Sequence, residues 1–386
     1  MRGATRIGDW TFAWRDESTT LSPDPDHATV FSFDLEGRPI SWFEDGRLYK
    51  RSLASEVHGR EQIRGPRRRF VVPPEEAAGM FERILRRVAG APIPSLDGDL
   101  RARLLDILRW TPESLLDERR RFEAAYRPVS ILPPDQYLAV VLQATFGCSW
   151  NRCTYCDFYQ DSPFRARTVQ EFASHAHSVK SLLGRGESLR KRIFLADGNA
   201  LILSSDRLHP LLEVALREFP GRAVNGFVDV FNGERRRRED WAMLRDLGLE
   251  RVHVGVETGH DPLLLFMNKP GSAEEALNLV ATLKAAGLSV AVIVMCGVGG
   301  DRHAAAHESD TARLLTRAPL GAGDIVYLSP FVEHPGSVYA SRAREAGVLP
   351  LDDARTEEQY ARLRDAVRRT HPGVRASRYD IREFIY

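Results

Sequence analysis

Residues 147–156 of this chain read GCSWNRCTYC, and they follow a β-branched, strand-like run at residues 137–143. The segment holds three of the four cysteines of the chain, namely Cys148, Cys153 and Cys156. Closing so short a loop costs little entropy, so three thiolates can converge there on one metal centre. The fourth cysteine, Cys296, is remote, and the pattern therefore indicates metal binding or catalysis and not a disulfide framework.

The composition of the 386 residues is that of an ordinary globular protein, with 43% hydrophobic and 28% charged residues. This mixture excludes wholesale disorder and collagen-like repeats. Lys and Arg number 54 and Asp and Glu 53, and the net charge of +1 argues against a nucleic acid or a membrane surface as partner. No apolar run approaches the roughly 20 residues that span a bilayer. Residues 1–16 lack the apolar core of a secretory signal, so we expect a cytoplasmic protein.

Downstream of residue 137, short apolar runs alternate with amphipathic stretches. Six runs predict strands, at residues 137–143, 192–196, 223–230, 251–256, 289–296 and 325–329. Helical patterns lie between them, near residues 169–183, 205–218, 236–247, 273–286 and 307–316. This alternation predicts an α/β fold with a parallel sheet, in which active groups gather at the carboxyl ends of the strands. A six-stranded partial barrel and an open doubly wound sheet both satisfy the pattern.

The first part of the chain reads as a separate module of mixed α+β structure. Strand-like runs surround turn signals at residues 29–33, 39–43 and 47–53, and helical patterns follow at residues 74–88, 100–110 and 119–126. A group of prolines marks its end, at Pro128, Pro133 and Pro134. We therefore predict an accessory module over residues 1–135, a core over residues 136–345 and a helical tail or cap over residues 346–386.

The residues themselves leave three kinds of site open at the cysteine loop. A structural zinc ion needs four ligands, and the fourth would have to be Cys296 or a distant histidine. A cubane iron–sulfur cluster held by three cysteines leaves one iron without a protein ligand, and that iron is useful only if it binds another molecule. The thiols could also serve redox chemistry. The position of the loop at a strand end, where the catalytic loops of α/β proteins lie, favours the cluster.

The cysteine motif resembles that of the radical S-adenosylmethionine (radical SAM) superfamily. Its spacing is C-x₄-C-x₂-C, whereas the usual spacing is C-x₃-C-x₂-C, and the longer first gap leaves the number of ligands intact. The resemblance implies that Cys148, Cys153 and Cys156 hold a 4Fe–4S cluster, whose open iron binds S-adenosylmethionine. It also implies the partial (β/α)6 TIM-like barrel of that family.

Further segments resemble the parts of the family that bind the cofactor. Tyr155 stands in the aromatic place on the adenine side. Asp197 and Asn199, in the run ADGNA, stand where the family contacts the methionine amine. Glu257, in the run GVETGHD, falls in the ribose-binding segment, where a carboxylate can accept two hydroxyls. Gly297, in the run CGVGGD, belongs to a glycine turn that lets adenine approach the backbone.

The resemblance implies an oxygen-sensitive radical SAM enzyme, which cleaves S-adenosylmethionine reductively and starts radical chemistry on a small-molecule or peptide substrate. A one-electron donor such as flavodoxin or ferredoxin would reduce the cluster. Glu333 and His334 follow the sixth predicted strand, where substrate contacts often fall, and they are our substrate-side candidates. The chain has no D-x-H-x-x-G run for cobalamin, so cobalamin-dependent methyl transfer is not expected.

Two other functions stay open. An RNA-modifying radical SAM enzyme would touch phosphates with the basic stretch at residues 64–69 and with Phe70. A zinc-stabilised binding module would need no catalysis at all. His303 and His307 have helical spacing but lack an acidic partner in a metal-binding pattern, and we expect them to be exposed on a helix.

Overall fold

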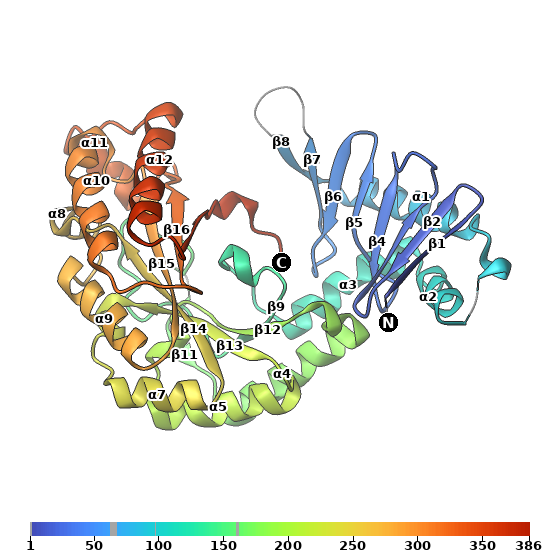
Figure 1. Cartoon of the computed structure of the whole chain (residues 1–386), viewed down its shortest axis with the longest axis horizontal. Helices are drawn as coiled ribbons and strands as arrows, with labels where there is room; N and C mark the ends of the chain where they lie inside the picture. The colour runs from blue at the N-terminus through green and yellow to red at the C-terminus, as the bar shows by residue number, and fades with distance from the viewer. Residues whose placement is uncertain (1, 62–67, 97, 160–161) are drawn as a thin grey trace. The chain divides into compact units, whose positions relative to one another are not determined.

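A computed structural model of the chain describes residues 2–61, 68–96, 98–159 and 162–386 (Figure 1). The chain divides into two compact units. The first comprises Met1–Pro128, His177–Lys191 and Ile385–Tyr386, and the second comprises Val129–Ala176 and Arg192–Phe384. Within the described residues, no helix has both the length and the apolar character that crossing a membrane requires. The finer division that we predict, at residues 135 and 345, stays a prediction.

An antiparallel sheet makes up most of the first unit, and its eight strands are neighbours in chain order. They are β1 (Gly3–Ile7), β2 (Trp10–Trp14), β3 (Ser18–Ser22), β4 (Val30–Asp34), β5 (Pro39–Glu44), β6 (Arg47–Arg51), β7 (Val57–Glu61) and β8 (Arg68–Val72). Three helices follow, α1 (Pro74–Ala89), α2 (Gly98–Leu108) and α3 (Pro112–Ala125). Strand residues such as Phe31 and Trp42 are buried in one core with Phe81 of α1. The predicted α+β module is therefore confirmed, although its sequence pattern indicated only β4, β5 and β6.

The turn between β4 and β5 carries a buried charge, Arg38, whose side chain is only 3% exposed. Its guanidinium donates to Asp34 and to Glu118 of α3, each at 2.8 Å. It also donates to the carbonyls of the last two residues of α4 (Val169–Leu183), at 2.8 and 2.6 Å. One side chain therefore ties the turn to two helices.

The second unit is built on a parallel sheet of seven strands with helices along its outside (Figure 1). In spatial order its strands are β9 (Ala139–Gln143), β12 (Arg192–Ala196), β13 (Ala223–Asp229), β14 (Leu249–Glu257), β15 (Ser289–Cys296), β16 (Ile325–Pro330) and β17 (Arg375–Arg378). This order follows the chain without a reversal. A doubly wound sheet reverses its strand order part-way, so that alternative is excluded. β9 and β17 occupy the two edges, and the predicted α/β fold with a partial barrel is confirmed.

Helices connect these strands on the pattern that the sequence predicted. After α4, the longer ones are α5 (Ser205–Glu218), α7 (Arg238–Asp246), α9 (Ala273–Ala285), α10 (Gly300–Arg317) and α12 (Asp353–Thr370). The shorter ones are α6 (Val230–Gly233), α8 (Asp261–Phe266) and α11 (Val338–Glu345). Single 3₁₀ turns are η1 (Ile93–Ser95), η2 (Pro134–Gln136), η3 (Gly184–Leu189), η4 (Ala200–Ile202) and η5 (Ile381–Glu383). A small antiparallel pair, β10 (Thr145–Phe146) and β11 (Arg165–Ala166), flanks the cysteine loop in the chain.

The seventh strand lies within residues 346–386, for which the sequence predicted only a helical tail or cap. Residues 375–378 read RASR and pair in parallel with β16, from Ile325 opposite Arg375 to Leu328 opposite Arg378. None of these four residues is β-branched or aromatic, so the segment carries no strand pattern of its own. It becomes a strand because the edge of β16 supplies backbone hydrogen-bond partners.

A buried polar cluster fixes the segment that precedes β9 against the strands. Asp135 accepts hydrogen bonds from Arg251 and from the hydroxyl of Tyr327, each at 2.7 Å, and it lies 3.2 Å from Nε2 of His253. Burial alone would raise the pKa of Asp135, but its hydrogen bonds to His253 and Tyr327 and the charge of His253 hold it well below its usual range. This cluster positions Ile131, four residues earlier, beside the cavity described below.

Replacing Arg38 by Met should lower the free energy of unfolding by about 3–5 kcal/mol, because Oδ2 of Asp34 and two carbonyls would stay buried without their donor. Urea denaturation measures this loss. Arg86→Met is the matched control, since Arg86 pairs with Glu82 on the exposed side of α1 and should change the unfolding free energy by about 0.5 kcal/mol at most. Equal losses in the two variants would contradict the structural role of Arg38.

Candidate functional site

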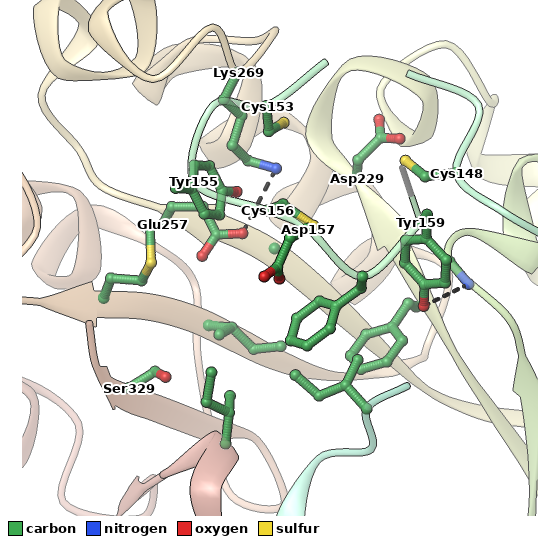
Figure 2. Close-up of a pocket in the computed structure, with 18 of the residues that line it drawn as sticks. Cys148, Cys153, Tyr155, Cys156, Asp157, Tyr159, Asp229, Glu257, Lys269 and Ser329 are labelled. Atoms are coloured by element: carbon green, nitrogen blue, oxygen red, sulfur yellow. Dashed lines mark hydrogen bonds and ion pairs between the residues drawn. The ribbon is translucent and has the colours of Figure 1, made fainter. Parts of the chain in front are cut away.

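A cavity of about 1150 Å³ opens at the carboxyl ends of the strands of the second unit (Figure 2). Successive strand ends supply residues to its lining, namely Asn199 after β12, Asp229 of β13, Glu257 of β14, Met295 of β15 and Ser329 of β16. Because the strands are parallel, residues that are far apart in the chain meet at this one edge.

The three cysteines of the loop line this cavity together, and each is a half-buried free thiol. The backbone N–H and the hydroxyl of Thr154 both donate to the carbonyl of Met267, at 2.9 and 3.1 Å. Tyr339 in turn donates its N–H to the carbonyl of Thr154 at 3.0 Å. At the start of the loop Gly147 has a φ of +66°, and a Cβ there would collide with the carbonyl of Ser162. The loop is therefore fixed by backbone contacts that need no metal.

The three thiols reach the cavity from different points of the loop. Figure 2 shows Cys148 across part of the cavity from Cys153 and Cys156. Among the described residues, no three His, Cys, Asp or Glu side chains lie close enough together to hold one ion. Cys296, which was one of two possible fourth ligands for zinc beside a distant histidine, is fully buried and is not part of the cavity lining. An iron–sulfur cluster accepts separated thiolates, because each one binds a different iron.

Burial raises the pKa of the Cys153 thiol to about 11 and that of Cys156 to about 12. Both are therefore neutral thiols near pH 7 when no metal is bound. A metal needs the thiolate forms, so its binding must displace protons at these two residues.

Glu257 sits at the end of β14 in a strained backbone conformation. Its φ is +66°, and the pairing of β14 with β15 is irregular between Gly255 and Glu257. The carboxylate lies 3.6 Å from Nζ of Lys269. Left-handed backbone at a residue other than glycine costs about 1–3 kcal/mol and persists only where the surroundings enforce it. It turns this carboxylate into the cavity, where Tyr155 and Lys269 also lie.

A buried histidine holds the turn behind Glu257. Nε2 of His307 lies 2.9 Å from the carbonyl of Met295, and Nδ1 lies 2.7 Å from the hydroxyl of Thr258. A carbonyl only accepts, so Nε2 carries the proton and Nδ1 accepts from Thr258. His307 is 0% exposed and His303 is half-buried, so the expectation that both would be exposed is wrong. The helix pattern missed this because α10 packs against the sheet through His307.

The two residues predicted at the end of β12 differ in their surroundings. Asp197 accepts a hydrogen bond from the hydroxyl of Tyr159 at 3.0 Å and is not among the lining residues of the cavity. Burial raises its pKa to about 6. Asn199 does line the cavity, where its Nδ2 donates to Asp229. Its Oδ1 is buried with no partner among the described residues, so it can accept a hydrogen bond from a bound ligand.

Three further predicted residues are divided between two cavities. His334 lines the main cavity, with its Nδ1 3.7 Å from Oδ2 of Asp157. Gly297 and Glu333 instead line a second cavity of about 540 Å³. Gly297 has a φ of +87°, and its N–H donates to Gln359 of α12 at 2.7 Å. The structure therefore brings Tyr155, Asn199 and Glu257 to the cysteines but does not bring Gly297 or Glu333 there.

The floor of the main cavity is apolar and comes largely from segments with no functional signal in the sequence. Its residues are Ile131, Phe227, Ile293, Tyr379 and Ile381. The hydroxyl of Tyr379 is buried and has no hydrogen-bond partner among the described residues. No motif could have pointed to Tyr379, because it directly follows the unpredicted strand β17. Asp229 and Lys269 are easier to find from the sequence than Tyr379. Asp229 ends a predicted strand, and Lys269 ends the segment that follows Glu257.

The basic stretch that an RNA-modifying enzyme would use falls mostly outside the described residues, which omit 62–67. Only Arg68, Arg69 and Phe70 of that stretch are described, and they belong to β8 in the first unit.

Comparison with known families agrees with this geometry. The family model of the Radical SAM superfamily matches residues 142–308, from the end of β9 into α10. Residues 142–308 of this chain therefore form a radical SAM domain. The predicted assignment to radical SAM enzymes is thereby confirmed, and the matched segment contains the three cysteines and Glu257.

Several solved structures are similar to this chain at low sequence identity. Methylornithine synthase PylB is 16% identical with a TM-score of 0.43, over 59% of this chain and 62% of its own. Coproporphyrinogen III oxidase HemN from Escherichia coli is 13% identical with a TM-score of 0.43, over 67% and 57%. Elp3 from Methanocaldococcus infernus is also 13% identical with a TM-score of 0.43, over 62% and 56%. This chain thus covers less than two thirds of each, and no curated protein matches it.

Acid should destabilise this radical SAM domain through His307. Burial lowers the pKa of His307 from 6.5 to about 4, so between these values the unfolded chain binds a proton that the folded chain does not. Folding stability is therefore lost as the pH falls from 6.5 through 4, by about 3 kcal/mol from this residue. Urea unfolding from pH 7 to pH 4 should give a shallower pH slope for His307→Gln than for the wild type. A control, His209→Gln on the outer side of α5, should keep the wild-type slope, and equal slopes for all three would contradict the assignment.

Proposed function

We propose that this radical SAM enzyme binds a 4Fe–4S cluster through Cys148, Cys153 and Cys156 and binds S-adenosylmethionine beside it. The observation that carries the proposal is that three thiols and the carboxylate of Glu257 line one cavity at the carboxyl edge of the sheet. When bound, the reduced cluster supplies the electron for reductive cleavage of S-adenosylmethionine, which starts radical chemistry on a substrate.

Different residues of the cavity would bind different parts of the nucleotide. Asn199 Oδ1 and Asp229 are acceptors, and they suit the donors of an amine. Glu257 would accept two neighbouring hydroxyls of the ribose, and the ion pair with Lys269 orients its carboxylate. Asp197 does not line the cavity, and its role is to position Asn199. The hydroxyl of Tyr159 donates to Asp197 and accepts from the N–H of Gly198, which fixes the backbone that leads to Asn199.

The apolar part of the cavity suits a substrate and excludes water from the reacting centre. Phe158, Met295 and Phe331 join the floor residues around it. Dry walls protect a reactive radical from side reactions. The substrate is a small molecule or a peptide, with its apolar part over the floor and His334 at the rim of the cavity. The electron comes from a carrier such as flavodoxin or ferredoxin.

Anaerobic reconstitution with iron and sulfide tests the ligand assignment. The wild type should take up about four irons and four sulfides per chain, and the Cys148→Ala, Cys153→Ala, Cys156→Ala triple variant should take up none. Cys296→Ala is the matched control, because Cys296 is buried outside the cavity lining, and it should bind iron as the wild type does. Unchanged iron in the triple variant, or about one zinc per chain, would refute the proposal.

Glu257→Gln should weaken the binding of S-adenosylmethionine about tenfold or more, because the amide accepts hydrogen bonds more weakly than a carboxylate does. Equilibrium dialysis of the reconstituted protein measures this Kd, and iron analysis checks that the cluster is intact. Glu333→Gln, at the second cavity, should leave the Kd unchanged. An unchanged Kd in Glu257→Gln would remove Glu257 from the nucleotide site.

A further inference from the structure

The outer side of the cysteine loop carries two arginines stacked on two aromatic rings. Arg152 lies over the ring of Trp150 with its guanidinium carbon 5.6 Å from the centroid. The ring of Trp150 is 6.4 Å from that of Phe231, and the guanidinium carbon of Arg235 lies 4.0 Å from the centre of Phe231. We call these four residues the arginine–aromatic surface. Two of them, Trp150 and Arg152, stand between Cys148 and Cys153 in the loop itself.

This surface is held rigidly although its charges are exposed. Nε1 of Trp150 donates to the carbonyl of Asn268 at 2.9 Å, and Nδ2 of Asn268 donates back to the carbonyl of Arg152 at 2.8 Å. Arg152 and Arg235 are exposed, while the two rings are half-buried. Exposed cation–π contacts of this kind contribute only about 0.5–1 kcal/mol, so stability alone is a weak reason for the arrangement. Arginine and large aromatic residues on a fixed backbone are instead typical of binding surfaces.

The charge of the arginine–aromatic surface is positive and locally uncompensated. Within the described part of the chain, neither Arg152 nor Arg235 forms an ion pair with a carboxylate. The neighbouring Arg237 and Arg238 do pair with acids, at 3.4 and 3.1 Å. Exposed Arg342 adds a further positive charge beside the same loop, where it donates to the carbonyl of Phe266 at 3.0 Å. The whole chain has a net charge of only +1, so this positive character is local.

We propose that the arginine–aromatic surface docks an acidic one-electron carrier protein. The inference rests on the proposed function, in which an electron must reach the three cysteines. A carrier bound here would be separated from the sulfurs only by the loop that holds them. Charge complementarity mainly accelerates encounter, which suits a donor that must bind, deliver one electron and leave. Redox partners of this kind bind through small interfaces, and the four residues would form the centre of one.

Nucleic acid is the other class of partner that arginines and aromatic rings can bind. The observations favour the electron carrier, because Trp150 and Arg152 lie between two predicted cluster ligands, where an electron would enter. A nucleic acid gains nothing from that position.

The test follows cluster reduction by stopped-flow absorbance in the full reconstituted chain, with a reduced acidic flavodoxin as the donor. Arg235→Glu is the main variant, because Arg235 lies outside the cysteine loop. Its second-order rate constant should fall about tenfold or more at low salt, and the difference from the wild type should shrink as salt is added. Reduction by dithionite should be unchanged. Arg369→Glu, on the last turn of α12 at the opposite edge of the sheet, makes the same charge change and should react as the wild type does.

Equal flavodoxin rates in the wild type and Arg235→Glu would overturn the proposal, and so would an equal slowing with dithionite. Binding of a labelled single-stranded RNA that Arg235→Glu abolishes, with flavodoxin kinetics unchanged, would assign the surface to nucleic acid instead. If Arg235→Glu fails to take up the cluster, Arg152→Gln and Arg235→Gln keep the test open, because each removes one charge without reversing it. A wild type that takes up no iron would instead refute the proposed function, which separates the two failures.

Discussion

The common direction of seven strands is the constraint on which this site depends. Because all of them run parallel, Asn199, Glu257 and Ser329 reach the same edge from distant parts of the chain. The cysteine loop joins that edge through the two hydrogen bonds from Thr154 to the carbonyl of Met267. A loop of ten residues cannot hold three thiols in place by its own bonds, so the sheet and the turn after α8 supply its rigidity.

The edge of the sheet is also where the structure concentrates its strain. Glu257 keeps a left-handed backbone that is unfavourable by about 1–3 kcal/mol. His307 offsets this by joining Thr258, the next residue, to the carbonyl of Met295 on β15. Lys269 secures the carboxylate itself. If S-adenosylmethionine binds here as we propose, its acceptors are already ordered and binding does not have to order them.

Sequence patterns predicted what is local and missed what depends on distant partners. The strands β9 and β12 to β16 are largely apolar runs, which the sequence pattern predicts. The cysteine spacing lies within ten consecutive residues, so the sequence also predicts the metal site. The strand β17 has no such pattern, because it forms only against the edge of β16. Tyr379 reaches the cavity through that strand, and His307 is buried only because α10 packs on the sheet. Gly297 followed the family pattern, yet Gln359 of α12 binds its N–H beside a separate cavity.

The two sides of the cysteine loop differ in charge, and this difference separates two tasks. The cavity side has the carboxylates of Asp157, Asp229 and Glu257 against one lysine that is already paired. The outer side has Arg152 and Arg235 without carboxylate partners among the described residues. A radical reaction needs a closed, dry space, whereas a protein donor needs an open, charged one, and no single surface satisfies both. In the proposed arrangement, the cysteine loop would separate a docked electron carrier from the substrate and would carry the electron between the two sides.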